Sequence, residues 1–405
     1  MRIILINHYA GTPKMGMEYR PYYMAQEWIK QGHQVVIIAA NNAHVRIIQP
    51  TLSNTIKEEN IDGIQYVWIK TPTYSGNGIK RILNMRSFVK RIRCKAKHFA
   101  ETYKPDVVIA SSTYPMDNYA AHKIAKLANA KYVYEVHDLW PLSPMELGGY
   151  KASHPYIKYL QKAEDFAYRN ADKVISMLPL TKEYMMNRGL DEKKWCYVPN
   201  GINIKEWENC IPLDPDVKKR IDDFKNKHSF LIGYAGGHNI SNALDTIIEA
   251  SKNIESKDVG FVFVGNGTEK QRLMQKTKTQ SNILFIRNVD KIQIPSLLNN
   301  FNVLYVGLKN NPLYRFGTSL NKLFDYMMAE KPIIQALNAG NDIVEEANCG
   351  ISIPAENKEK LLSAIAKMQE MSEEDRNALG KNGQNYVVKN HDYSILAKKC
   401  IEILK

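Results

Sequence analysis

The sequence predicts an α/β protein built from two Rossmann-like βαβ domains that face each other across a cleft. Three observations support this class. Short runs rich in Val and Ile alternate with helix-length segments, as in parallel sheets covered on both faces. The alternation restarts after Pro199-Asn200-Gly201. The chain has 405 residues, which is enough for two domains of ordinary size.

The expected elements follow this rhythm along the chain. A helix is expected near Arg20–Gln31, where Gly32 ends it. The first set of strands is Ile3–Asn7, Val35–Ala40, Tyr66–Ile69, Val107–Ala110, Tyr132–Val136 and Val174–Met177. The second set is Phe230–Tyr234, Gly260–Val264, Ile283–Ile286, Val303–Val306 and Pro332–Ile334. We therefore expect domains at 1–200 and 201–391, joined by a polar link within 200–225. A last helix, about 392–405, is expected to pack back on the first domain.

Composition excludes several classes of protein. Hydrophobic residues make up 44% of the chain and charged residues 24%, which are globular proportions. Apolar runs fall far short of the roughly 20 residues that span a bilayer. Five scattered cysteines without a CxxC pattern favour a reducing compartment, so we expect a cytoplasmic protein. The net charge of +13 is concentrated in residues 1–200, which suggests that the first domain faces an anionic partner.

Residues 315–327 hold the pattern that points most strongly to a function. A loop rich in Gly, Ser and Thr precedes a helix expected to begin near Ser319–Asn321, and the free N–H groups of such a start suit a diphosphate. Arg315 and Lys322 can supply cations, and Asp325 can accept hydrogen bonds from ribose hydroxyls. The alternative is an ordinary amphipathic helix, capped by Ser319, with a core face of Leu323, Phe324 and Met327.

Residues 319–332, Ser-Leu-Asn-Lys-Leu-Phe-Asp-Tyr-Met-Met-Ala-Glu-Lys-Pro, resemble the donor-binding signature of retaining GT-B glycosyltransferases of family 4. Other matches follow in family order, at residues 7–20 with Gly32-His33, at 136–141, at 198–202 and at 265–267. The opening residues 7–20 resemble bacterial O-antigen and capsule enzymes of the N-acetylfucosaminyltransferase-like group. The resemblance implies a GT-B fold and a nucleotide-sugar co-substrate.

The resemblance also implies roles for individual residues. His137 would hydrogen-bond the donor sugar at the catalytic centre, beside Asp138, although a capping or core role for His137 is the alternative. Glu18, Arg20 and Tyr114 are expected near the acceptor or its loop, and a surface salt pair is the alternative for Glu18 and Arg20. The donor-binding residues would be Gly16, Gly236, Gly237, Asn288, Arg315, Gly317, Thr318, Ser319, Leu320, Asn321, Lys322 and Asp325.

Two departures from the family pattern affect the expected donor site. Gly317 stands eight residues before Asp325, where the family motif has a glutamate that contacts the sugar, so deoxy or amino sugars become plausible donors. The loop 234–245 lacks the Arg and Lys of many family members, so backbone N–H groups of 236–239 are expected to help Arg315 and Lys322 hold the diphosphate. No metal-ligand spacing is evident, and we expect neither an essential metal nor another cofactor.

Residues 79–99 contain eight Lys and Arg residues and no acid. An apolar stripe runs through them at helical spacing: Ile82, Met85, Val89, Ile92, Ala96 and Phe99. One interpretation is a solvated helix packed on the sheet. The other is a helix on the inner face of the cell membrane, with cations toward anionic lipid. Those cations are Lys80, Arg81, Arg86, Lys90, Arg91 and Arg93.

We therefore expect a retaining hexosyltransferase that moves a sugar from a UDP-sugar, with an N-acetylated amino or deoxy sugar among the candidates, to a lipid-linked saccharide in bacterial surface polysaccharide biosynthesis. One alternative is a UDP-sugar 2-epimerase of the same fold, which would not need the basic face at 79–99. A nucleic-acid-binding protein would leave 315–327 unexplained and lacks aromatic residues among its cations. An inactive binding module is a further alternative, which hydrolysis of a nucleotide sugar would exclude.

Overall fold

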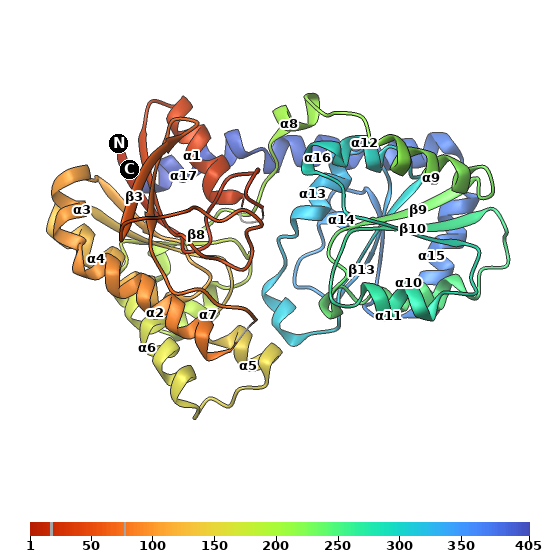
Figure 1. Cartoon of the computed structure of the whole chain (residues 1–405). Coiled ribbons are helices and arrows are strands. Elements are labelled where there is room, and N and C mark those ends of the chain that lie inside the picture. The colour runs from red at the N-terminus through yellow and green to blue at the C-terminus, as the bar shows by residue number, and fades with distance from the viewer. Residues whose placement is uncertain (17–18, 77) are drawn as a thin grey trace. The chain divides into compact units, whose positions relative to one another are not determined.

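The computed structural model describes residues 1–16, 19–76 and 78–405, which form two compact α/β units (Figure 1). The first unit comprises Met1–Asn200 together with Tyr393–Lys405, and the second comprises Gly201–Asp392.

The sheet of the first unit has the strand order β3-β4-β2-β1-β5-β6-β7-β8, and its described pairs are parallel except β3 with β4. The strands are β1 (Arg2–Ile6), β2 (Gln34–Ala40), β3 (Ile56–Ile61), β4 (Ile64–Ile69), β5 (Val107–Ala110), β6 (Lys131–Val136), β7 (Lys173–Ser176) and β8 (Trp195–Tyr197). The helices are α1 (Arg20–Lys30), α2 (Ile79–Cys94), α3 (Ala96–Tyr103), α4 (Asn118–Ala128), α5 (Leu142–Gly148), α6 (Pro155–Asn170), α7 (Lys182–Asn187) and α17 (Tyr393–Leu404).

The last helix of the chain belongs to this first unit. Helix α17 packs on α1, where the rings of Tyr23 and Tyr393 stack with their centroids 5.1 Å apart. The indole N–H of Trp28 donates to the carbonyl of Ala397. These side chains share one apolar core with β1, β2, β4 and β5, so the two helices cover one face of the sheet.

The second unit has the strand order β11-β10-β9-β12-β13-β14, and its described pairs are parallel. The strands are β9 (Phe230–Ala235), β10 (Val259–Val264), β11 (Ile283–Ile286), β12 (Val303–Gly307), β13 (Ile333–Ala336) and β14 (Gly350–Ile353). This is the doubly wound order 3-2-1-4-5-6, which reverses direction between β9 and β12. Ligands of such sheets bind beyond the carboxyl ends of the strands at that reversal.

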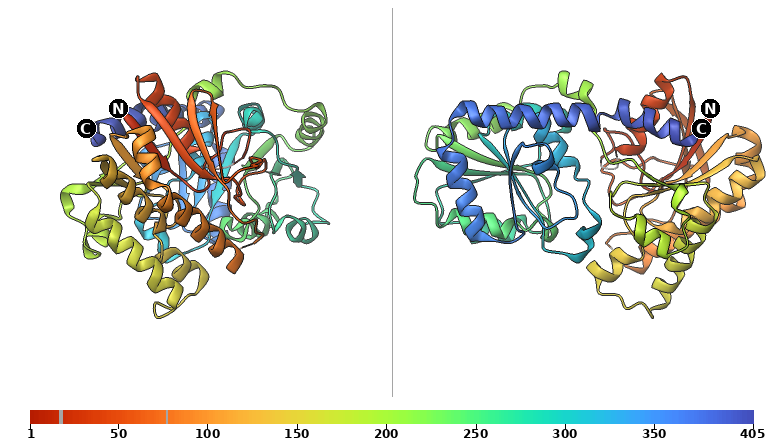
Figure 2. Two further views of the ribbon diagram at one scale, coloured as in Figure 1. Left: turned by 60° about the vertical axis from the view of Figure 1, so that its left-hand side comes forward. Right: turned by 180° about the vertical axis from the view of Figure 1, so that it is seen from behind.

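Helices lie on both faces of this second sheet (Figures 1 and 2). They are α8 (Ile204–Glu208), α9 (Pro215–Lys225), α10 (Leu244–Ser251), α11 (Lys270–Lys276), α12 (Ile294–Leu298), α13 (Asn321–Met328), α14 (Ile343–Glu346), α15 (Lys358–Glu370) and α16 (Glu373–His391). One core layer packs α9, α12, α13 and α14 against the sheet, and the other packs α10, α11 and α15 against the opposite face.

The expected strands are present, with ends shifted by at most two residues, whereas β3, β8 and β14 were not expected. The expected polar link at 200–225 is wrong, because most of it forms α8 and α9 of the second unit. The single helix expected at 79–99 is also wrong. It ends at Cys94, and Lys95 turns the chain into α3, which buries Ala96 and Phe99. Within the described residues, no helix combines the length and apolarity needed to cross a membrane.

Candidate functional site

Lys322 lies at the carboxyl end of the second sheet, in the first turn of α13. Its ammonium Nζ is 3.1 Å from the hydroxyl of Tyr234 and 2.5 Å from Oδ1 of Asn242. It also lies 4.9 Å from the centroid of the Tyr234 ring. Among the described ion pairs, none joins this ammonium to a carboxylate. Burial lowers the pKa of Lys322 to about 8, so a nearby anion would stabilise its charged form.

A glycine loop after β9 holds this arrangement. The Tyr234 hydroxyl and the amide of Asn242 both donate to the carbonyl of Gly237, at 2.7 and 2.9 Å. A Cβ atom at Gly236 would lie 3.3 Å from Nζ of Lys322, so the absence of a side chain lets the lysine lie against the loop. Tyr234 of β9 and the loop residues Gly236, Gly237 and Asn242 thus orient a cation at the point where the strand order reverses.

The start of α13 lies within the expected range. The helix begins at Asn321 with Leu320 as its N-cap, which confirms the expected start near Ser319–Asn321, whereas the alternative of a helix capped by Ser319 is wrong. The backbone of Thr318 is already engaged, because its N–H donates to Oδ1 of Asn341 at 2.7 Å and its carbonyl accepts from Nδ2 of the same side chain. The backbone N–H of Thr318 is therefore already used within the unit, and the role of Thr318 in donor binding stays a prediction. The first-turn N–H groups of Asn321 and Lys322 have no acceptor within the helix by geometry.

Asp325 follows one turn later and faces a different set of groups. Burial raises the pKa of its carboxyl to about 6, opposed by the charge of Lys291 and a hydrogen bond with Trp207. Lys291 in turn pairs with Glu206 at 3.0 Å. Asp325 is thus half-buried between α13 and α8, with a carboxyl group that changes charge near neutral pH.

The remaining donor candidates lie on neighbouring loops of the second unit. Oδ1 of Asn288 accepts a 2.6 Å hydrogen bond from Asn266, which ties the loops after β10 and β11 together. Arg315 is exposed, and its Nη1 donates to the carbonyl of Pro312 at 2.6 Å. Gly317 has φ 93° and ψ 176°, a conformation that favours glycine. The family's glutamate would be strained in this backbone conformation, which agrees with its replacement by glycine here.

In the first unit, His137 follows β6 and joins a buried polar network. Its Nε2 lies 2.9 Å from the hydroxyl of Ser111 and 3.3 Å from Oε2 of Glu135. Arg20 donates to Oε1 of Glu135 through Nε at 3.0 Å and Nη2 at 2.9 Å. Burial opposes ionisation of Glu135, but Arg20 and the hydrogen bonds from His137 and Ser111 hold its pKa well below its usual range. Asp138, the next residue, has an exposed side chain.

Two residues expected near the acceptor are buried instead. Arg20 is 4% exposed and also donates to the carbonyls of Val198 and Pro199. Tyr114 is fully buried, with its hydroxyl 2.6 Å from Nδ1 of His8. Both side chains are therefore structural in this unit, which corrects the expected acceptor roles. Glu18 lies outside the described residues.

Gly16 is close to the segment around Arg46, with which it forms an antiparallel bridge. Its φ of 122° favours glycine, and a Cβ atom would lie 3.1 Å from the backbone nitrogen of Ile47. The loop expected to close over the donor is thus fixed at this residue by close backbone approach.

Sequence reasoning missed several side chains that shape these sites. Tyr234 lies in the last turn of chain within β9 and Asn242 follows in the next loop, but neither side chain carries a recognisable signal in the sequence. Asn341, Ser111 and Glu135 act through contacts between distant parts of the chain, which no local pattern reveals. Within the described ranges, no group of three or more His, Cys, Asp or Glu side chains is arranged to hold a metal ion.

Two family models match most of the chain. Residues 15–206 match Glycosyltransferase Family 4, and residues 229–371 match Glycosyl transferases group 1. A curated relative, the probable glycosyltransferase WbjE of Pseudomonas aeruginosa, is 20% identical over 333 residues, which are 80% of this chain and 78% of that protein.

Solved structures agree with the fold. HepE of Anabaena, in complex with UDP and glucose, aligns with a TM-score of 0.68 and 14% identity over 100% of this chain and 99% of that one. WaaG, a glycosyltransferase involved in lipopolysaccharide biosynthesis, aligns with a TM-score of 0.68 and 16% identity over 100% and 99%. The chain is therefore a glycosyltransferase of the GT-B fold, with a Glycosyltransferase Family 4 unit followed by a group 1 unit.

Proposed function

We propose that this enzyme transfers a sugar from a nucleoside-diphosphate sugar, with a UDP-sugar as the first candidate, to a lipid-linked saccharide during assembly of a bacterial surface polysaccharide. The observation that carries the donor proposal is the Lys322 ammonium, held by Tyr234 and Asn242 at the start of α13 and beside a glycine loop. HepE, a structure of similar fold, is described in complex with UDP and glucose, which supports uracil as the base.

The chemical requirement of the donor half is to stabilise a departing diphosphate. Lys322 supplies a full positive charge, and the N–H groups of Asn321 and Lys322 add the partial charge of the helix start. Groups that are already oriented before the bond breaks need no reorganisation when the negative charge develops. Arg315 is the second cation of this proposal. Asp325 would accept hydrogen bonds from the ribose hydroxyls once its carboxyl is ionised.

His137 and Asp138 are the proposed contributions of the first unit to the reacting sugar. The network of Ser111 and Glu135 fixes one ring nitrogen of His137, so the imidazole has a defined orientation. Transfer is proposed to proceed with retention of configuration, as the family resemblance implies. The resemblance to WaaG and the basic surface of α2 support a lipid-linked acceptor and peripheral association with the inner face of the cell membrane.

Binding of nucleotides tests the donor proposal directly. Calorimetry and thermal unfolding with UDP, GDP, ADP and a panel of their sugars should single out one nucleotide sugar. A ligand at 100 times its Kd stabilises the folded protein by about 2.7 kcal/mol, which is easily measured. Lys322→Met should abolish the shift while the free protein stays folded, whereas Lys257→Met, at an exposed cation of the same unit, should preserve it. Unchanged affinity in Lys322→Met would contradict the site.

A further inference from the structure

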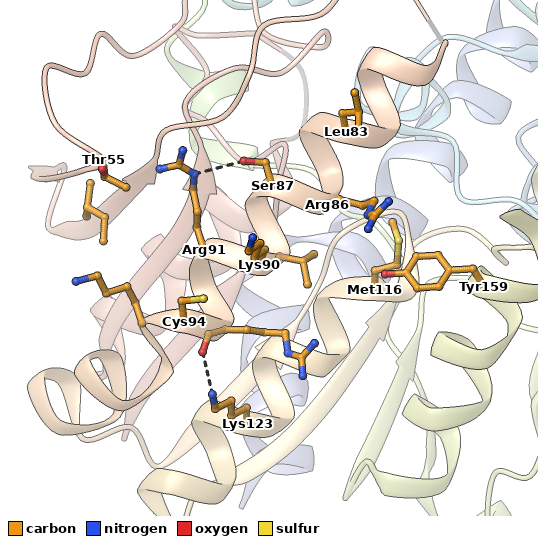
Figure 3. Close-up of a pocket in the computed structure, with 14 residues that line it drawn as sticks. Thr55, Leu83, Arg86, Ser87, Lys90, Arg91, Cys94, Met116, Lys123 and Tyr159 are labelled. Carbon is orange, nitrogen blue, oxygen red and sulfur yellow. Dashed lines mark hydrogen bonds between the residues drawn. The ribbon is translucent and has the colours of Figure 1, made fainter.

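A basic pocket lies along α2 in the first unit, with a volume of about 840 Å³. Figure 3 shows α2 between Thr55 on one side and Met116 and Tyr159 on the other. The volume is within the range of about 300–1,000 Å³ typical of small-molecule sites. We call this hollow the α2 pocket.

The charged side chains that line the α2 pocket are all cations. Six of its lining side chains are cations and none is an acid: Arg86, Lys90, Arg91, Arg93, Lys95 and Lys123. Among the described ion pairs, none involves any of these six. Their polar contacts are with neutral groups, as in the hydrogen bond from Lys123 Nζ to the carbonyl of Arg93 at 3.1 Å (Figure 3). Such a concentration of cations without acids attracts a compact anion of more than one charge.

Apolar side chains border these cations. Leu83 is 51% exposed and Tyr159 is 42% exposed, and both line the pocket. Ile79, one turn before Leu83 on the same face of α2, is 75% exposed. Exposed aliphatic groups next to cations are typical of helices that lie in a membrane interface, where the apolar groups enter the acyl boundary and the cations meet phosphates.

We propose that the α2 pocket binds the phosphate headgroup of an anionic membrane lipid, with Leu83 and Ile79 entering the acyl region beside it. This goes beyond a diffuse attraction of a basic surface to the membrane, because a pocket distinguishes headgroups of equal charge. It rests on the proposed function only in placing the first unit at a membrane. Nucleotide binding by the second unit is a separate property and can be measured in the same variants.

The first experiment compares binding of the full chain to vesicles of phosphatidylcholine containing either phosphatidic acid or phosphatidylserine at equal surface charge. A pocket for a phosphate headgroup should favour phosphatidic acid by at least about fivefold, since nonspecific attraction depends mainly on surface charge. Equal binding to the two vesicle types would overturn the proposal. Stronger binding to RNA than to either vesicle would also overturn it.

Matched charge reversals identify the surface that binds. Arg86→Glu with Lys90→Glu changes two exposed cations of the pocket, and Lys97→Glu with Lys126→Glu changes two exposed cations of α3 and α4 outside it. The pocket pair should lower affinity for phosphatidic acid vesicles by at least about tenfold and the control pair by less than about threefold. Equal losses would overturn the proposal. Arg86→Gln with Lys90→Gln keeps the test available if the reversal prevents folding. UDP-sugar binding should be unchanged in every variant.

A thiol within the pocket allows a direct test of occupancy. Cys94 lines the pocket and is exposed, and the exposed Cys210 of the second unit can be replaced by serine. Soluble dihexanoyl phosphatidic acid at ten times its Kd should slow maleimide labelling of Cys94 by about tenfold. Dihexanoyl phosphatidylcholine should leave the labelling rate unchanged, and inorganic phosphate at the same concentration, which lacks acyl chains, should slow it clearly less than dihexanoyl phosphatidic acid does. Equal protection by inorganic phosphate would show a simple anion site and overturn the lipid assignment.

Discussion

Arg20 and Glu135 form an ion pair inside the first unit, with Nη2 and Oε1 2.9 Å apart and side chains 4% and 5% exposed. The second carboxylate oxygen accepts from the hydroxyl of Ser111 at 2.6 Å and lies 3.3 Å from Nε2 of His137. One buried pair therefore links the start of α1, the end of β6 and the histidine proposed to meet the donor sugar. Its integrity should affect both stability and the orientation of that histidine.

Arg20→Met should be strongly destabilising, because it leaves Glu135 buried without its cation. Removal of one partner of a buried pair costs about 3–5 kcal/mol. We expect that loss in the free energy of unfolding measured with urea at pH 7. The double variant Arg20→Met with Glu135→Leu should lose clearly less, since it removes both charges together. A loss in the double variant equal to that in Arg20→Met would contradict the role assigned to the pair.

The same pair predicts a dependence of stability on pH. The pKa of Glu135 is well below its usual 4.5 in the folded protein. The stabilisation that ionised Glu135 gives the folded protein is therefore fully present above about pH 5, and it declines as the pH falls below about 4.5. Urea unfolding between pH 6 and 3 should show this decline in the wild type, and the double variant should show a shallower one. Parallel curves for the two proteins would refute the assignment.

The sequence was informative wherever one segment carried its own signal. Buried strands such as β5 and β10 are continuous apolar runs, and the periodicity of α13 identified its core face correctly at Leu323 and Phe324. Strand β3 was missed because its residues, Ile-Lys-Glu-Glu-Asn-Ile, are those of a polar sheet edge. Strand β8 has only three residues, which are too few to distinguish from a loop.

The errors at the candidate site came from contacts between distant residues. Arg20 was expected near the acceptor, because no local pattern shows that its partner is Glu135, which is 115 positions away. The alternative helix with Ser319 as its cap is wrong, because Asn341 fixes the backbone of Thr318 and the helix begins at Asn321. Local propensity identifies a helix start to within a few residues, whereas the tertiary partner decides which residue begins it.

Donor binding should be confined to a window of pH set by Asp325 and Lys322. The carboxyl of Asp325 has a pKa of about 6 and accepts from ribose best when ionised, while Lys322 has a pKa of about 8 and attracts the diphosphate only when protonated. Both are charged between these values, so the affinity for a nucleotide sugar should be highest near pH 7. Calorimetry from pH 5 to 9 measures this profile.

Two substitutions test the acidic and the alkaline limit of this pH dependence separately. Lys322→Arg should move the alkaline limit upward, because the guanidinium stays protonated across the range. Asp325→Asn should remove the acidic limit and weaken binding at pH 7 by about tenfold or more, the loss of a charged acceptor. A wild-type profile that is flat from pH 5 to 9 would show that neither group contacts the ligand.

Replacing Gly317 by the family's glutamate should destabilise the protein. Its φ of 93° and ψ of 176° belong to a region that side chains strain by about 1–3 kcal/mol. Gly317→Ala and Gly317→Glu should both lower the free energy of unfolding by that amount, and the glutamate should not increase transfer. Gly78→Ala is the matched control, with φ −84° and open space around the site, and should cost less than about 1 kcal/mol. Wild-type stability in Gly317→Ala would contradict the strain.

Glu164 should make the first unit less stable as pH rises toward neutrality. This fully buried residue of α6 accepts hydrogen bonds from Tyr168, Tyr184 and Gln161 at 2.9, 3.0 and 2.6 Å. Burial raises the pKa of its carboxyl from 4.5 to about 7, so the folded protein binds the proton more tightly than the unfolded chain does. The free energy of unfolding should therefore fall between pH 4.5 and 7 by up to about 3 kcal/mol from this group.

Glu164→Gln should remove that pH dependence, because the neutral amide keeps the size and an acceptor oxygen without the charge. Urea unfolding should give similar stability for variant and wild type at pH 5 and an advantage of about 1–3 kcal/mol for the variant at pH 8. Glu183→Gln, at an exposed carboxylate of α7, removes the same charge and should leave the difference between pH 5 and pH 8 as in the wild type. If Glu164→Gln lost equal stability at both pH values, the three hydrogen-bond donors would stabilise the wild-type carboxylate of Glu164, contrary to its raised pKa.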